Sequence, residues 1–260
     1  MTSKISCQGC RDGAELPFAF TMAFQPILDV SNTRVWGYEA LVRGPDGQGA
    51  GMVLDQVTPE LMYKFDQACR VRAIELFGQL SPQDDTRLSI NFMPNAVYEP
   101  AACIRASLGA AARVGLNPKR LMFEFTEQEH FTDTAHISKI VAEYKRQGFM
   151  TALDDFGSGY AGLNLLANLQ TDLIKIDMDL IRDIHTDRVR QAIVAGIMSI
   201  ARTLDIQVIA EGIESEAELT TLRAAGVSLF QGYYFAKPQV EALPAVGGFA
   251  SSTLPQTLRA

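Results

Sequence analysis

Eight short apolar runs recur along the chain, and most of them are nearly continuously apolar. They are rich in Val, Ile, Phe and Leu, as expected for strands that are buried on both faces. The runs cover residues 20–28, 35–42, 87–92, 121–125, 149–155, 172–177, 206–212 and 227–232. From about residue 85 to 235, strand and helix candidates alternate with short connections. This pattern predicts either a parallel α/β barrel or an open doubly wound sheet.

The first two apolar runs break this rhythm. Only DVSNT separates FQPIL from RVWGYEALV, which leaves no room for a crossover helix. Parallel neighbours need a connection of about a dozen residues or more, whereas antiparallel neighbours need only a tight turn. These two runs therefore predict an antiparallel hairpin.

Helices are predicted between the strand candidates from apolar residues at three- and four-residue spacing. One such series covers residues 61–80 and places Cys69 on its apolar side, so we expect this thiol in the core. Ser215 followed by Glu218 predicts a capping box at the start of a later helix, and Gly226 is suited to its end.

Length and charge narrow the classes of function. A single (β/α)₈ barrel takes ~250 residues, so 260 residues do not require two domains. The chain has 23 Lys and Arg against 30 Asp and Glu, a net charge of −7. This balance argues against general nucleic-acid binding, because no basic patch dominates. An anionic substrate would need local cationic side chains or bound metal.

The two ends of the sequence lack a periodic pattern. We expect tails at residues 1–16 and 246–260 around one domain at 17–245. No apolar stretch approaches the ~18–20 residues that span a bilayer, and no signal peptide is evident, so we expect a cytoplasmic protein. Cys7 and Cys10 form a CxxC without a second ligand pair. Thiols without a structural role, a redox role and an intermolecular metal site all stay open for this pair.

Polar side chains lie at the ends of seven consecutive strand candidates. In (β/α)₈ enzymes the active site lies at the C-terminal ends of the strands. One such residue is often only the N-cap of the next helix, but seven strand ends with carboxylate, amide or ammonium groups predict a site. These residues are Glu39, Asn91, Glu124, Asp154, Asp155, Lys175, Asp177, Glu211, Glu214 and Gln231.

Part of this set offers only oxygen donors, which select hard cations such as Mg²⁺ or Mn²⁺ before zinc. Without a cation the carboxylates would repel one another. Two metals ~3.5–4 Å apart could bridge a phosphate oxygen and an activated water, which lets an acidic protein hold an acidic substrate. The donors are Glu39, Asn91, Glu124, Asp154 and Asp155.

The adjacent pair Asp154 and Asp155 belongs to the stretch TALDDFGSGY. Successive side chains of a strand point to opposite faces, so the two carboxylates can share a site only where the strand ends. We expect the chain to turn there, with Gly157 and Gly159 letting the next loop bend back over the mouth. The pair is interpreted as metal ligands rather than as an acid–base dyad.

The ordered motifs identify a family. The triplet Glu39-Ala40-Leu41 follows FQPI, and NFMP, FEFTE, DDFGSGY, KID, AEGIE and QGYYF come after it. Over roughly residues 18–242 the chain resembles the EAL family of cyclic-di-GMP phosphodiesterases, and its first half is most similar to EAL domains joined to BLUF photosensors. The resemblance implies a (β/α)₈ barrel with one antiparallel strand. It also implies Mg²⁺- or Mn²⁺-dependent hydrolysis of cyclic di-GMP to linear pGpG.

The resemblance assigns roles to the matching residues. Asp155 would bind a second metal or be shared between the two, Lys175 would orient the attacking water, and Glu211 would be the general base or a partner of that water. Glu127 would hold the loop that follows Asp155. The metal ligands would be Glu39, Asn91, Glu124, Asp154 and Asp155, and Glu39, Lys175 and Glu211 would form the catalytic set. Substrate contacts would come from Gln25, Leu41, Arg43, Asp177, Glu214 and Gln231, with Arg43 as the phosphate clamp.

Two other interpretations stay open. One is an inactive cyclic-di-GMP receptor or protein-interaction module, although such members usually lose an acid that this sequence keeps. The other is an unrelated metal-dependent barrel enzyme, such as an enolising one, which would not explain Gln231, FQPI or the motif order.

In the EAL family the segment 156–164 lies against a partner subunit, which implies a homodimer. AGLNLL departs there from a common Ser-Ser-Leu sequence. This departure bears on regulation more than on chemistry, and a regulatory protein partner is a further possible input.

Overall fold

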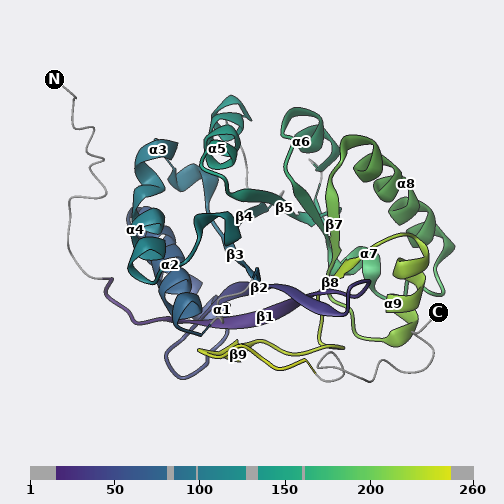
Figure 1. Cartoon of the computed structure of the whole chain (residues 1–260), viewed down its shortest axis with the longest axis horizontal. Helices are drawn as coiled ribbons and strands as arrows, with labels where there is room; N and C mark the ends of the chain where they lie inside the picture. Colours follow the sequence, from purple (N-terminus) through teal and green to yellow (C-terminus); the bar gives the residue numbers. More distant parts are fainter. Residues whose placement is uncertain (1–15, 81–84, 98, 127–133, 160–161, 247–260) are drawn as a thin grey trace.

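A closed barrel of eight strands forms the centre of the protein in a computed structural model (Figure 1). The structure describes residues 16–80, 85–97, 99–126, 134–159 and 162–246. Each apolar run of the sequence forms one strand of the barrel. The strands are β1 (Thr21–Asp29), β2 (Arg34–Arg43), β3 (Arg87–Asn91), β4 (Leu121–Thr126), β5 (Met150–Phe156), β6 (Leu173–Ile176), β7 (Gln207–Ala210) and β8 (Leu229–Phe230).

Strand β1 closes the barrel and runs against its two neighbours. It pairs antiparallel with β2 and with β8, whereas the strands from β2 to β8 are parallel. The predicted hairpin and the barrel with one antiparallel strand are therefore confirmed, and the open doubly wound sheet is excluded. A further short strand, β9 (Gln239–Val240), pairs with β1 outside the barrel and was not apparent from the sequence.

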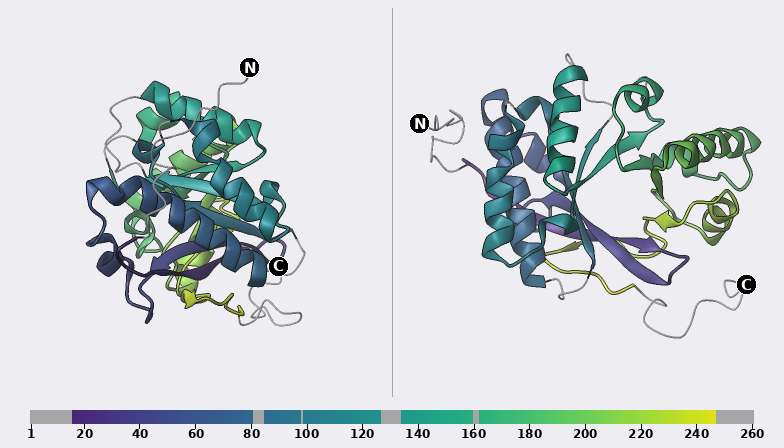
Figure 2. Two further views of the ribbon diagram at one scale, coloured as in Figure 1. Left: turned by 90° about the vertical axis from the view of Figure 1, so that its left-hand side faces the viewer. Right: turned by 45° about the horizontal axis from the view of Figure 1, so that its top comes forward.

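Helices surround the barrel, and two of them, α1 and α2, also contact the β1–β2 hairpin (Figures 1 and 2). The predicted capping box is present, since the Ser215 hydroxyl accepts from the Glu218 N–H and the Glu218 carboxylate accepts from the Ser215 N–H. No described helix is long and apolar enough to cross a membrane. The helices are α1 (Ala50–Leu54), α2 (Pro59–Leu80), α3 (Pro100–Cys103), α4 (Arg105–Arg113), α5 (Thr134–Arg146), α6 (Gly162–Asn168), α7 (Met178–Ile181), α8 (Arg188–Leu204) and α9 (Glu216–Ala224), with 3₁₀ turns η2 (Pro94–Ala96) and η3 (Pro118–Arg120).

Apolar side chains fill the end of the barrel at which the parallel strands begin. We call this group the apolar layer, because its members pack together inside the barrel, apart from the larger core under the helices. Each member is at most 5% exposed. The apolar layer consists of Ile27, Trp36, Met122, Ala152, Leu173, Ile209 and Leu229.

Helix α2 departs from its predicted pattern. Cys69 is only half-buried and Leu80 is 38% exposed, so the apolar side expected over 61–80 is not uniformly core. In contrast, Asp66 and Arg70 are buried on this helix. The physical reason is that α2 packs against α4 and η2 as well as against the barrel, so its buried surface is wider than an apolar stripe.

Candidate active site

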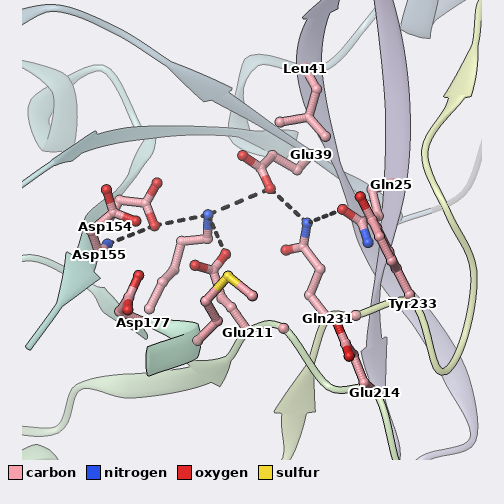
Figure 3. A pocket seen from close by; sticks show the side chains of 14 residues that line it. Gln25, Glu39, Leu41, Asp154, Asp155, Asp177, Glu211, Glu214, Gln231 and Tyr233 are labelled. Atoms are coloured by element: carbon pink, nitrogen blue, oxygen red, sulfur yellow. Dashed lines mark hydrogen bonds and ion pairs between the residues drawn. The ribbon is translucent and has the colours of Figure 1, made fainter. Parts of the chain in front are cut away.

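Most of the residues predicted at the strand ends surround one cavity at the C-terminal end of the barrel (Figure 3). The cavity has a volume of about 310 Å³. The strand register brings its lining together, because Gln25 lies opposite Glu39 on neighbouring strands. Its predicted lining residues are Gln25, Glu39, Leu41, Asp154, Asp155, Lys175, Asp177, Glu211, Glu214 and Gln231.

Lys175 on β6 lies at the centre of the acidic residues, and its side chain is 1% exposed. Its ammonium nitrogen lies 2.6 Å from Glu124 Oε2, 2.7 Å from Glu211 Oε1, 3.1 Å from Asp154 Oδ1 and 3.6 Å from Glu39 Oε2. Four carboxylates around one ammonium leave an excess of negative charge where water screens it poorly. Such a site favours additional cations.

The amide side chains hold Glu39 from both sides. Gln231 Nε2 donates to Glu39 Oε2 at 2.6 Å and to Gln25 Oε1 at 3.2 Å, and Asn91 Nδ2 donates to Glu39 Oε1 at 3.0 Å. Both oxygens of this carboxylate are thus fixed in place. Gln231 Oε1 is buried and has no hydrogen-bond partner among the described residues, so it is available to accept from a ligand.

The adjacent aspartates reach one cavity through a bulge, rather than through the turn that we expected at the end of the strand. β5 continues past both residues to Phe156, and its register with β6 shifts between Leu153 and Phe156. Asp155 has a left-handed φ of 54°, and its N–H donates to Asp154 Oδ1 at 2.9 Å. A bulge adds one residue to a strand and re-aims a side chain, so both carboxylates face the cavity. Gly157 follows with a φ of 97°, as expected for a chain that bends there.

Burial and mutual repulsion shift the acid–base properties of the site. Burial raises the pKa of Glu124 to about 8, against the opposing charge of Lys175. Burial and the charge of Asp154 raise the pKa of Asp155 to about 6, and burial raises the pKa of Glu211 well above its ordinary value. Burial alone would lower the pKa of Lys175, but the surrounding carboxylates raise it well above its ordinary value. The ammonium therefore stays charged while the acids retain protons more readily.

Two groups of carboxylates are placed to hold metal. Oxygen atoms of Glu39, Glu124 and Asp154 lie within 4.8 Å of one another, and so do those of Asp154, Asp155 and Glu211. Asp154 belongs to both groups. Oxygen-only donors and excess negative charge suit hard divalent cations. The donor set therefore fits two such cations that share Asp154.

Four of the predicted residues do not line the cavity or are not described, and one of them, Glu124, is fully buried beside Lys175. Asn91 lies beside Glu39 and lines a neighbouring apolar cavity instead. Arg43 is half-buried on β2, and its Nη1 donates to the carbonyl oxygen of Val42 at 2.7 Å. Glu127 lies outside the described residues.

Two lining residues also have local structural contacts. Asp177 is the N-cap of α7, where its Oδ1 accepts from the Asp179 N–H at 2.8 Å. Glu214 lies at the rim, with Arg182 Nη2 3.6 Å from its Oε1. These contacts leave both side chains at the cavity surface, where a substrate could compete for them.

Sequence reasoning missed three residues of the site. Ser89 donates its hydroxyl proton to Glu124 Oε1, and it precedes Asn91 by two positions on β3, so strand periodicity could have found it. Tyr233 lines the rim with 56% exposure, two positions after Gln231 in QGYYF. Met178 also lines the cavity, and no sequence signal marks it.

Known structures resemble this chain closely. A standalone EAL protein from Vibrio cholerae O395, in its c-di-GMP-bound form, is 52% identical with a TM-score of 0.87, over 92% of this chain and 100% of that one. Klebsiella pneumoniae BlrP1, in a manganese and cy-diGMP complex at pH 6, is 34% identical with a TM-score of 0.82, over 90% and 59% of the two chains.

The curated relatives that this chain matches are longer proteins. The blue light- and temperature-regulated antirepressor BluF of Escherichia coli K12 is 31% identical over 86% of this chain and 55% of its own length. The probable cyclic di-GMP phosphodiesterase PdeA of the same organism is 32% identical over 81% and 30%. The chain thus spans about half or less of these relatives. The EAL domain family profile matches residues 18–238. With this match and with its acids gathered at the mouth of the barrel, the chain belongs to the EAL domain family.

Proposed function

We propose that this chain hydrolyses cyclic di-GMP to linear pGpG in a reaction that needs Mg²⁺ or Mn²⁺. The observation that carries the proposal is that four carboxylates surround Lys175 at one cavity. The structures of similar EAL proteins with bound c-di-GMP and manganese support the class of substrate and of metal. The family match removes the unrelated barrel enzyme from consideration.

The donor set divides between two cation positions. Asn91, Glu39, Glu124 and Asp154 would hold one cation, and Asp155 and Asp154 would hold the other. When bound, the cations supply positive charge against the phosphate and lower the pKa of a water molecule. Gln231 and Asn91 keep Glu39 oriented by holding its two oxygens.

Lys175 and Glu211 act on the attacking water. Their ammonium and carboxylate contact each other directly at 2.7 Å at the cavity, so both can bond to one water molecule that lies beside the pair, and Glu211 receives its proton. The water oxygen bonds to phosphorus and the bond to the 3′ oxygen breaks. That oxygen takes up a proton, which leaves a 5′-phosphate and a 3′-hydroxyl on the linear product.

The remaining lining residues bind the substrate. Leu41 offers an apolar side chain beside Glu39, and Gln231 Oε1 and Gln25 offer polar contacts. Asp177 and Glu214 contact the substrate from the rim. Arg43 clamps a phosphate after its side chain leaves the Val42 carbonyl oxygen, and Glu127 holds the loop after Asp155.

A second candidate function is a cyclic-di-GMP receptor or protein-interaction module without catalysis. The specific observation in its favour is that one relative over 86% of this chain is named an antirepressor. The experiment that separates the two is incubation of the pure chain with cyclic di-GMP and Mn²⁺, with and without EDTA, followed by chromatography. Linear pGpG formed only with metal supports the enzyme, and binding without product supports the receptor.

We also propose that the chain forms a homodimer whose contact, through the segment 156–164, controls occupancy of the Asp155 position. Helix α8 exposes apolar side chains at helical spacing, which supports self-association: Val189 68%, Ile193 43%, Ile200 37% and Leu204 42%. Sedimentation and specific activity measured across protein concentration test this, because a fully active monomer at all concentrations contradicts it. A regulatory protein partner, the cytoplasmic location and the domain bounds 17–245 stay predictions.

A further inference from the structure

A buried ion pair lies on helix α2, next to the candidate site but outside it. Asp66 is 3% exposed and Arg70 is fully buried, one helical turn further along. Arg70 Nη2 lies 2.8 Å from Asp66 Oδ2, and Arg70 Nε donates to the same oxygen at 3.0 Å. Arg70 Nη1 also donates to the hydroxyl of Ser107 on α4 at 3.4 Å. The pair is therefore held on two sides within the protein.

Stability alone is a weak explanation for this pair. Moving two charges out of water has a large desolvation cost, and apolar side chains of similar volume often fill such a place equally well or better. The residues around it on α2 include the core side chains Phe65, Ile74 and Phe77. An apolar pair would suit this helix face, so the other contacts of the pair become informative.

The second oxygen of Asp66 is bound to the chain that leaves β3. Asp66 Oδ1 accepts from the Met93 N–H at 2.8 Å, and the Phe92 N–H donates to the Glu124 carbonyl oxygen at 3.0 Å. The backbone directly after Asn91 is thus fixed at two successive residues, at Phe92 by β4 and at Met93 by α2. Asn91 is the side chain that meets Glu39 at the first cation position.

We propose that Asp66 is a positioning residue that fixes the place of Asn91 as a metal ligand, and that Arg70 orients Asp66 for this task. Asp66 does not line the cavity of the candidate active site and does not contact its acidic cluster. It acts on the site through the Met93 backbone. The inference rests on the proposed function, because it requires that Asn91 and its neighbours bind a divalent cation. Groups that orient a ligand from outside the coordination shell contribute to metal affinity.

The experiment compares Mn²⁺ affinity, measured by calorimetry and by the free Mn²⁺ electron paramagnetic resonance signal, with thermal unfolding. The variants are Asp66→Asn, Asp66→Leu and the double variant Asp66→Leu with Arg70→Met. Glu75→Gln is the matched control, because Glu75 lies on the same helix and pairs with Arg113 at 2.6 Å on the surface.

We expect Asp66→Leu with Arg70→Met to fold and to weaken Mn²⁺ binding by about 10–100-fold. Asp66→Asn keeps an oxygen for the Met93 N–H and should lose less affinity, whereas Glu75→Gln should bind as wild type does. Asp66→Leu alone leaves the buried charge of Arg70 without its partner. If this variant does not fold, the double variant provides the test. A folded double variant with wild-type Mn²⁺ affinity overturns the inference.

Failure of the proposed function is a separate outcome. A wild-type chain that binds Mn²⁺ but does not hydrolyse cyclic di-GMP overturns the activity, and the Mn²⁺ comparison still decides the role of Asp66. A wild-type chain that binds no Mn²⁺ overturns both.

Discussion

The two ends of the barrel interior are built from the same strands but have opposite chemistry. On β6, Leu173 belongs to the apolar layer, and Lys175, two residues later on the same face, is surrounded by carboxylates. On β4, Met122 and Glu124 repeat this relation. On β1 the order reverses, with Gln25 before Ile27, because this strand runs the other way.

This comparison separates stability from function along one strand. Burial of apolar surface favours folding by roughly 25 cal/mol per Å², so the apolar layer stabilises the barrel. The group that we call the polar layer has the opposite effect, because it gathers like charges out of water. It consists of Gln25, Glu39, Glu124, Asp154, Lys175, Glu211 and Gln231. We infer that the stability of the apolar layer offsets the unfavourable gathering of charges in the polar layer.

The largest expected effect of a single change is in the polar layer. Glu39→Ala removes a carboxylate from the proposed first cation position and leaves Asn91 and Gln231 without their shared acceptor. Hydrolysis of cyclic di-GMP with saturating Mn²⁺ should fall by ~10³-fold or more, which corresponds to the several kcal/mol that a metal contributes. Thermal unfolding is the control for folding. A rate near that of the wild type would show that the site assignment is wrong.

The matched change in the apolar layer should act on stability instead. Leu173→Ala removes a fully buried side chain two residues from Lys175 on the same strand. The free energy of unfolding, measured with denaturant, should fall by about 2–5 kcal/mol because a cavity is left behind. The turnover number of the folded fraction should stay close to that of the wild type. A large loss of turnover without loss of stability would break the comparison.

The sequence predicted which residues gather in the polar layer better than it predicted how they are arranged there. Parallel strands end on one side of a barrel, so acids such as Glu124 and Asp154 could be placed at one mouth from strand ends alone. The central position of Lys175 could not, because it depends on barrel closure and on side chains from four other segments. The bulge at Asp155 was also missed, since no sequence rule applied to TALDDFGSGY specifies a left-handed aspartate within a strand.

The buried pair on α2 shows a second limit. An aspartate and an arginine four residues apart on a helix usually indicate a solvent-exposed pair. Asp66 and Arg70 are buried because α4 and the chain after β3 pack over them, and those contacts are remote in sequence. The role of Arg43 stays a prediction: its motif position implies a phosphate contact, and in this structure its Nη1 donates to the Val42 carbonyl oxygen.

A smaller effect should appear in the pH dependence of stability without metal. Burial raises the pKa of Glu124 from an ordinary 4.5 to about 8, so the folded state binds this proton more tightly than the unfolded state. Its contribution to stability is complete below pH 4.5 and is lost as pH rises through about 8. Thermal unfolding in EDTA should therefore show lower stability at pH 9 than at pH 6.

Glu124→Gln provides the control for this measurement, because an amide of similar shape does not titrate. The variant should lose much of the decline between pH 6 and pH 9, and Leu173→Ala should keep it. If the wild-type protein in EDTA became more stable between pH 6 and pH 9, the polar layer would not have the excess of negative charge that we infer.

The smallest expected effect concerns a cation at the apolar end. The Arg87 guanidinium carbon lies 4.8 Å from the centroid of the Trp36 ring, so here an aromatic face, rather than a set of carboxylates, meets the positive charge. Arg87→Met keeps the aliphatic length and removes the charge. Because Arg87 is partly exposed, the free energy of unfolding should fall by only about 0.5–1 kcal/mol.

A double-mutant cycle with Trp36→Leu isolates this contact, since removing Arg87 after Trp36 should cost less than removing it first. Purely additive effects on the free energy of unfolding would show that the contact between Arg87 and Trp36 does not stabilise the protein. Turnover of cyclic di-GMP by Arg87→Met should equal that of the wild type, because its charge faces the apolar layer and lies away from the cavity lining. A changed turnover would mean that the two ends are coupled through β3, where Arg87 begins the strand and Asn91 ends it.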